Sequence, residues 1–141
     1  MGRAPLRITA DTNVLVRAAV LDDPRQADLA AEVLRDADLI AVTVSALCEF
    51  VWVMARGYKR SSDEIVGMIR NLLESATVRA DRPVIEAGLA MLEAGGDFAD
   101  GVIAFEGSRL GGTVFVSFDR KALELIAASD GQTHLLGATA D

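Results

Sequence analysis

The sequence predicts an α/β protein in which a parallel sheet carries helices on both faces. Short apolar runs typical of strands alternate along the chain with longer segments whose apolar residues recur every three to four positions. This alternation favours a parallel sheet, because the connection between two parallel strands is usually a helix. The 141 residues show no internal repeat and no linker, so one domain over residues 1–141 is expected.

The predicted strands are short runs of apolar or alternating side chains between residues typical of turns or helix caps. Residues 6–10 alternate in polarity, whereas the run at residues 113–118 has an apolar centre, as in a buried strand. The last run is the weakest of the set. The five strands are predicted near residues 6–10, 39–42, 77–79, 113–118 and 134–136.

Most of the predicted helices begin at a capping residue, and several end at Gly or before Pro. Asp11 is suited to cap the N-terminus of the first helix. The Asp-Asp-Pro sequence that ends at Pro24 breaks this helix. Ser61 and Glu64 form a capping box before the clearest apolar stripe, and Pro83 stands in a first turn. The helices are predicted at residues 11–19, 26–35, 43–57, 61–73, 81–93 and 97–110, with a last one from residue 121.

Composition restricts the classes of function. Cys48 is the only cysteine, which excludes a disulfide framework and favours a reducing compartment. The start of the chain lacks signal-peptide features, and no apolar run approaches ~18 residues, so a cytoplasmic protein without a membrane span is expected. A net charge of −7 argues against nonspecific coating of nucleic acids, but not against a nucleic-acid enzyme. A hydrophobic content of 51% suggests a surface covered by an oligomer or partner.

Four acidic residues, Asp11, Glu49, Asp100 and Asp119, stand in or against apolar segments. An isolated buried carboxylate costs several kcal/mol unless a cation meets it. Asp11 follows the first predicted strand and Asp119 follows the fourth, and ligands of parallel sheets bind beyond this end of the strands. The chain offers few bases for burial, so the sequence suggests a metal site.

Structural roles would also explain most of these acids. Asp11 suits a helix cap and Asp119 a turn. Asp97 and Asp100 suit the first turn of a helix, where they favour its dipole and could form a capping box.

Glu49 lies in a helix that is apolar nearly all round, so its burial is expected. A buried ion pair with Arg17 or Arg56 is the alternative to a metal.

A cluster of carboxylates without histidine or cysteine favours a hard ion. Mg²⁺ and Mn²⁺ prefer oxygen ligands, whereas zinc prefers nitrogen and sulfur, and His134 is the only histidine in the chain. One or two such ions can activate water and stabilise the leaving oxygen of a phosphoryl displacement. Phosphodiester hydrolysis fits this arrangement without a covalent nucleophile.

Four stretches of the chain resemble the successive motifs of PIN-domain ribonucleases, and most closely those of VapC toxins from bacterial toxin-antitoxin pairs. They are residues 10–16 (ADTNVLV), 47–53 (LCEFVWV), 97–104 (DFADGVIA) and 117–122 (SFDRKA). The resemblance runs nearly end to end. It implies a three-layer α/β/α sandwich with a central parallel sheet, and RNA cleavage with Mg²⁺ or Mn²⁺.

The resemblance also implies roles for residues. The catalytic metal ligands would be Asp11, Glu49, Asp100 and Asp119, with Asp97 as an additional candidate. Ligand orientation would fall to Thr12, Asn13 and Ser117, where Ser117 replaces a threonine often found in the family. Candidate RNA contacts are Arg17, Lys59, Arg60, Arg120 and Lys121.

Partners follow from the same resemblance. A homodimer and a small antitoxin protein, which would insert a peptide near the acidic site, are expected. Candidates for these surfaces are Trp52, Tyr58 and the stripe at residues 65–73, although a place in the core is the favoured explanation for them.

The function expected is therefore that of a Mg²⁺- or Mn²⁺-dependent endoribonuclease, the toxin of a toxin-antitoxin pair that blocks translation. The alternatives are a PIN-domain RNA-processing nuclease outside such a pair, and a PIN-like module that binds without cleaving. A haloacid-type phosphatase would need a second aspartate at position 13, where Asn13 stands. A receiver domain would need an acidic pair after the first strand, which this sequence lacks.

Overall fold

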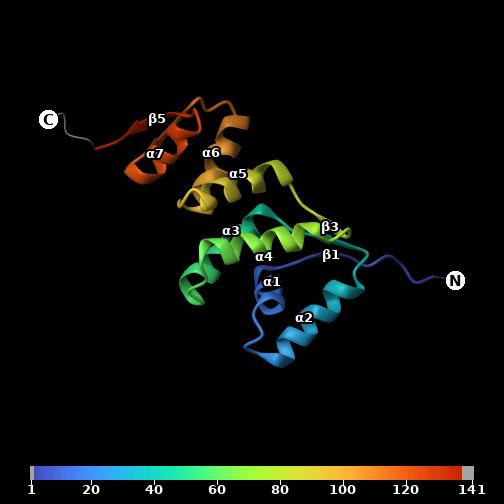
Figure 1. Cartoon of the computed structure of the whole chain (residues 1–141). Coiled ribbons are helices and arrows are strands. Elements are labelled where there is room, and N and C mark those ends of the chain that lie inside the picture. Colours follow the sequence, from blue (N-terminus) through green and yellow to red (C-terminus); the bar gives the residue numbers. More distant parts are fainter. Residues whose placement is uncertain (1, 138–141) are drawn as a thin grey trace. The chain divides into compact units, whose positions relative to one another are not determined.

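The computed structural model describes residues 2–137, which form seven α-helices, one π-helical turn and five strands (Figure 1). Contacts between Cα atoms divide the chain into two compact units, residues 1–81 and residues 82–141. Each unit contains its own parallel strand pairing. The single domain expected from the sequence stays a prediction.

The first unit contains a three-stranded parallel sheet of order β1-β2-β3. Ile8 lies opposite Ile40, and Ile40 lies opposite Val78 on its other side. Its elements are β1 (Arg7–Thr9), α1 (Thr12–Ala19), α2 (Pro24–Asp36), β2 (Leu39–Ala41), α3 (Val44–Trp52), the π-helical turn η1 (Val53–Gly57), α4 (Ser62–Glu74) and β3 (Val78–Arg79). The core of this unit includes the fully buried side chains of Leu47 on α3, Met54 on η1, and Ile65 and Ile69 on α4.

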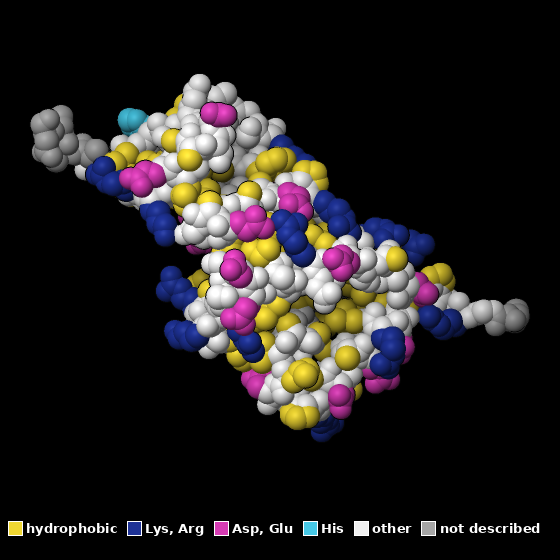
Figure 2. Space-filling view, in the orientation of Figure 1, with side chains coloured by type: hydrophobic (Ala, Val, Ile, Leu, Met, Phe, Trp, Pro, Cys, Tyr) yellow, Lys and Arg dark blue, Asp and Glu magenta, His cyan; other side chains and the backbone are white. Residues whose placement is uncertain are grey.

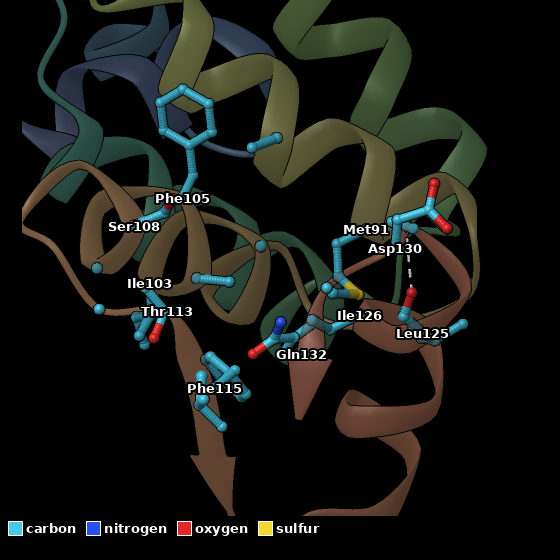
Figure 3. A pocket seen from close by; sticks show the side chains of 18 of the residues that line it. Met91, Ile103, Phe105, Ser108, Thr113, Phe115, Leu125, Ile126, Asp130 and Gln132 are labelled. Atoms are coloured by element: carbon cyan, nitrogen blue, oxygen red, sulfur yellow. Dashed lines mark hydrogen bonds between the residues drawn. The ribbon is translucent and has the colours of Figure 1, made fainter. Parts of the chain in front are cut away.

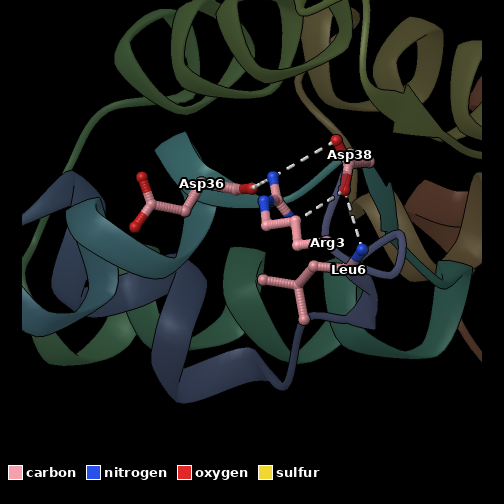
Figure 4. A network of polar contacts seen from close by, with 4 residues as sticks. All are labelled: Arg3, Leu6, Asp36 and Asp38. Atoms are coloured by element: carbon pink, nitrogen blue, oxygen red, sulfur yellow. Dashed lines mark hydrogen bonds and ion pairs between the residues drawn. The ribbon is translucent and has the colours of Figure 1, made fainter. Parts of the chain in front are cut away.

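Polar contacts fix the chain before β1. The carboxylate of Asp38 accepts a hydrogen bond of 2.7 Å from the backbone N–H of Leu6 and an ion-paired one of 3.1 Å from Arg3 (Figure 4). Arg3 also donates to the backbone carbonyl of Asp36 at 3.2 Å. The hydrogen bond from Leu6, followed by the charge of Arg3, lowers the pKa of Asp38. These contacts secure the entry to β1.

The second unit contains a two-stranded parallel sheet, in which Val116 of β4 lies opposite His134 of β5. Its elements are α5 (Arg82–Glu93), α6 (Phe98–Arg109), β4 (Val114–Ser117), α7 (Arg120–Ala128) and β5 (Gln132–Leu135). Helices α5 and α6 approach closely at two glycines. A Cβ on Gly88 would lie 2.6 Å from the ring of the fully buried Phe98, and one on Gly101 would lie 2.5 Å from the carbonyl oxygen of Ala87.

The observed elements follow the predicted order, with two informative differences. Helix α2 begins at Pro24, two residues before the predicted start, because Asp23 caps the helix by accepting from Gln26 N–H and proline suits the first helical position. The helix predicted at residues 43–57 changes to π-helical geometry at Val53. None of the helices in the described part of the chain is long and apolar enough to cross a membrane.

Candidate active site

In the first unit, Asp11 stands between β1 and α1. It is the N-cap of α1, and its Oδ1 accepts a hydrogen bond of 2.9 Å from the N–H of Thr12. The side chain is exposed, and among residues 2–137 its Oδ2 has no hydrogen-bond partner. The cap explains the local conformation of Asp11, but it leaves one carboxylate oxygen available for a ligand.

Thr12 joins the first acid to the second. Its side chain is only 7% exposed, and its Oγ1 donates a hydrogen bond of 2.9 Å to Oε2 of Glu49 on α3. The backbone and the hydroxyl of this one residue therefore each hold one carboxylate oxygen, and its role in orienting metal ligands stays a prediction. Asn13 is exposed, and its side chain makes no hydrogen bond to the described residues.

Asp11 and Glu49 line a common hollow of about 260 Å³. It lies at the end of β1 and beside the first turns of α1 and α3. The remaining lining residues are Thr9, Ala10, Thr12, Thr43, Ser45 and Ala46. Small and hydroxyl-bearing side chains thus surround the two acids, and no base is among them.

The expected burial of Glu49 is wrong. Helix α3 buries one side only, and Glu49 lies on the exposed side together with Ser45 and Trp52. The exposed tryptophan had made the helix look apolar all round. The alternative ion pair with Arg17 is also wrong, because Arg17 pairs with Asp22 at 3.1 Å.

Arg56, the other base considered for Glu49, forms no ion pair within the described residues. Glu49 therefore meets a hydroxyl and solvent in place of a cation.

In the second unit, Asp97 and Asp100 occupy the N-terminus of α6. Asp97 is the N-cap and accepts from Ala99 N–H at 3.0 Å, so its capping role is confirmed. Asp100 is half-buried in the first helical turn. Burial raises the pKa of Asp100, and the negative charges of Asp97 and Asp119 raise it further. The protein therefore disfavours the ionised form of the Asp100 carboxylate.

Asp119 is held at the start of α7. Its Oδ1 accepts from Ala122 N–H at 3.2 Å, and its backbone N–H donates to Ser117 Oγ at 2.9 Å. Ser117 thus fixes the turn that carries Asp119, and its role in orienting a metal ligand stays a prediction. The serine that replaces threonine retains the hydroxyl needed for this bond.

The donor set fits a hard divalent ion. Carboxylate oxygens are the ligands that Mg²⁺ and Mn²⁺ prefer, and no ion pair of the described chain neutralises any of the five acids. No group of three or more His, Cys, Asp or Glu within residues 2–137 forms a ready metal cluster. The acids divide into one pair in the first unit and three residues in the second, so a ligand set that combines them stays a prediction.

A larger hollow of about 800 Å³ lies in the second unit, but it does not contain the acids of α6 and α7. Figure 3 shows its mainly apolar lining, including Met91, Ile103, Phe115 and Ile126. Neither Asp100 nor Asp119 lines it. The size of this hollow therefore gives no indication of where the chemistry occurs.

The candidate RNA contacts differ in their availability. Arg17 and Arg60 are engaged in ion pairs with Asp22 and Glu64, at 3.1 and 3.2 Å. Among these candidates, Lys59, Arg120 and Lys121 are exposed and form no ion pair with the described residues. Lys and Arg side chains are scattered among acidic ones over the visible face, without a continuous basic surface (Figure 2).

Comparison with protein families decides the broader identity. The PIN domain model matches residues 8–128. The chain belongs to the PIN domain family. Proteins of this family are in general nucleases that act on RNA and typically use divalent metal ions, and the predicted PIN-like α/β fold class is confirmed. No curated protein matched the chain, so the VapC subtype stays a prediction.

Proposed function

We propose that this PIN domain is an endoribonuclease that hydrolyses RNA phosphodiester bonds with Mg²⁺ or Mn²⁺. The proposal makes Asp11, Glu49, Asp100 and Asp119 necessary for one and the same reaction, with Asp97 as an additional ligand. The observation that carries it is a set of carboxylates held by hydroxyls and helix N-termini but lacking basic partners among the described residues. A bound divalent ion would activate water and stabilise the leaving oxygen.

Residues of the first unit would keep two oxygens ready for the ion. Thr12 fixes Oε2 of Glu49 through its hydroxyl and Oδ1 of Asp11 through its N–H. The other oxygen of each carboxylate stays available, because none of the described residues donates to it. Orientation by hydrogen bonds to ligands is a common feature of metal sites.

Residues of the second unit would contribute through charge. Asp100 is repelled by Asp97 and Asp119, and burial strips it of part of its hydration. A divalent cation would offset both the repulsion and the lost hydration, which explains why these acids lie close to one another. Arg120 and Lys121, which follow Asp119 directly, are proposed to contact phosphates of the RNA, as are Lys59 and the ion-paired Arg17 and Arg60.

We further propose that the enzyme is the toxin of a toxin-antitoxin pair, that it acts in the cytoplasm to block translation, and that it forms a homodimer inhibited by a small antitoxin. Large apolar side chains are exposed in both units, among them Leu21 at 74% and Leu110 at 89%. Surfaces of this kind support association with partners. An RNA-processing nuclease outside such a pair and a non-cleaving module are the competing functions.

Cleavage of labelled RNA by the purified full chain tests the catalytic proposal. Activity is expected with Mg²⁺ or Mn²⁺, and excess chelator should abolish it. Asp100→Asn should remove activity, whereas Asp130→Asn, a matched change at an exposed position with φ of 67°, should not. Undiminished cleavage in chelator would contradict metal dependence, and binding without cleavage under all conditions would favour the non-cleaving module.

Growth arrest on expression tests the toxin role. Arrest should require Asp100 and should be relieved by the product of a small neighbouring gene. Cleavage in vitro without arrest in the cell would favour a processing nuclease.

A further inference from the structure

An exposed stripe along α3 and η1 leads away from Glu49. It consists of Ser45, Glu49, Trp52 and Arg56, which are exposed and lie at helical spacing on the side opposite the buried residues of α3. These four residues are called the α3 stripe below. Its acidic member lines the hollow of the proposed active site, so whatever occupies the rest of the stripe lies beside that site.

Trp52 is the unusual member of the α3 stripe. Its side chain is 62% exposed, although tryptophan is highly buried on average. The expectation that Trp52 belongs to the core is therefore wrong. A flat, exposed indole is suited to stacking on a nucleic-acid base, and single-stranded nucleic acids commonly bind to aromatic platforms of this kind.

Two cations accompany the indole. Arg56 lies on the stripe, Lys59 follows it closely in the chain, and both are exposed without an ion pair in the part of the chain that is described. In Figure 2, Lys and Arg side chains stand beside the turn between α3 and α4. In a chain of net charge −7, unpaired cations next to an aromatic platform complement a phosphate backbone.

The end of η1 is held rigidly. The hydroxyl of Tyr58 donates to Asp22 at 3.0 Å, and Arg17 donates to Asp22 at 3.1 Å and to the Tyr58 hydroxyl at 3.4 Å. These bonds tie the residue after η1 to α1 and to the loop that follows α1. The end of the segment that carries Trp52 and Arg56 is therefore anchored before any ligand arrives, which reduces the backbone entropy lost on binding.

The spacing along α3 is close to that of stacked nucleotides. At ~1.5 Å per α-helical residue, Trp52 lies ~4.5 Å along the axis from Glu49, and Arg56 lies farther along the chain in η1. A stacked strand rises ~3.4 Å per nucleotide, so a base on Trp52 would lie one to two nucleotides from the acid.

We propose that the α3 stripe binds the single-stranded RNA segment next to the cleaved bond, with one base stacked on the Trp52 indole and neighbouring phosphates contacted by Arg56 and Lys59. This inference rests on the proposed function, because it names the substrate form that the same site would accept. A protein partner or a second copy of the chain would cover Trp52 in another way, and the test separates these occupants.

Trp52 is the only tryptophan in the chain, so its fluorescence reports on the proposed contact directly. A short single-stranded RNA oligomer is titrated into the full chain in chelator, which separates binding from cleavage. Quenching of the emission is expected with this oligomer, and little with an abasic oligomer of equal length or with inorganic phosphate. Unchanged emission at saturating RNA would overturn the inference.

Affinity of the labelled oligomer provides the second measurement. Trp52→Ala should weaken the Kd about 5- to 150-fold, the range expected for loss of one stacked base, and Trp52→Phe should restore part of the loss. Leu21→Ala, which removes another exposed apolar side chain from the same unit, should leave the Kd unchanged. Equal affinity of Trp52→Ala and the wild type would refute the stacking role.

Salt dependence tests the cations. Arg56→Gln should lower the slope of log K against log salt by about 0.7, the value for one contact to a single strand, whereas Arg25→Gln, an exposed cation on α2, should not. If emission from Trp52 changes with protein concentration instead of RNA, a second copy covers the stripe and the inference is wrong. If the protein binds RNA through Trp52 but never cleaves it, the inference about the α3 stripe holds and the proposed function is wrong.

Discussion

Gly101→Ala should separate two helices that pack almost backbone to backbone. Gly101 lies on α6, next to Asp100 in sequence, and faces α5. A Cβ at this position would lie 2.5 Å from the carbonyl oxygen of Ala87 and 3.0 Å from Cα of Gly88. Both contacts are to backbone atoms, which cannot rotate away as a side chain can, so the whole helix must move.

The magnitude follows from two opposing effects. Alanine is favoured over glycine within a helix by about 1 kcal/mol, and overpacking of a tight contact costs typically 1–3 kcal/mol. Gly107→Ala, on the same helix, gains only the first effect, because its added Cβ would meet no atom within 4 Å beyond the adjoining residues of its own helix. The free energies of unfolding of the two variants should therefore differ by about 1–3 kcal/mol, with Gly101→Ala the less stable.

Urea denaturation of both variants, followed by far-ultraviolet circular dichroism, measures this difference. It should appear in the midpoints without a change in slope. Because the displaced helix carries Asp100, Gly101→Ala should also bind Mn²⁺ more weakly than Gly107→Ala. Equal midpoints for the two variants would refute the close packing of α5 against α6.

Three further predictions concern charge and hydrogen bonding. Without metal, Asp100→Asn should stabilise the protein at neutral pH, because a group whose pKa is raised in the folded state loses stability as the pH rises through that pKa. Melting temperatures should show the gain at pH 7 but not below pH ~3.9, and a gain at both would contradict this reasoning. Asp38 has a lowered pKa, so it contributes stability above its unfolded-state pKa, and this stability is lost as the pH falls. Asp38→Asn should therefore lower the melting temperature at pH 7 by more than in acid, and an equal loss at all pH values would argue against this mechanism. Thr12→Val should lower the free energy of unfolding in urea by about 1 kcal/mol and should slow RNA cleavage, because it removes the hydroxyl bonded to Glu49 but keeps the side-chain volume. Thr12→Ser should retain both stability and activity, and full activity of Thr12→Val would show that the hydroxyl is dispensable.

Local sequence patterns predicted the secondary structure well because their causes are local. The capping box at Ser61 is present, with Glu64 reciprocating to the backbone N–H of Ser61. Ile65 and Ile69 are buried as their spacing predicted for a core stripe. The π-helical turn had no such pattern, and the structure offers no physical reason for its position in the sequence.

Properties that depend on neighbours elsewhere in the chain were harder to predict. Glu49 was expected to be buried because Trp52 was counted with the apolar side of its helix, although both lie on the exposed side. The close approach of Gly88 and Gly101 requires knowing that α5 and α6 pack together, which neither sequence segment states alone. The joint action of the four acids stays a prediction, supported by family membership and by the chemistry of the side chains.

The π-helical turn has a consequence for how the length of this segment is constrained. Its hydrogen bond from Tyr58 N–H to the Val53 carbonyl, 3.2 Å long, encloses one residue more than an α-helical turn. Deleting a single residue between Val53 and Gly57 would let this turn wind as a regular α-helix and would leave the residue after it facing nearly the same way. The Tyr58 hydroxyl would then still reach Asp22 and Arg17. Deleting a second residue would turn Tyr58 by about 100° around the axis, so this segment tolerates a chain shorter by one residue but not by two.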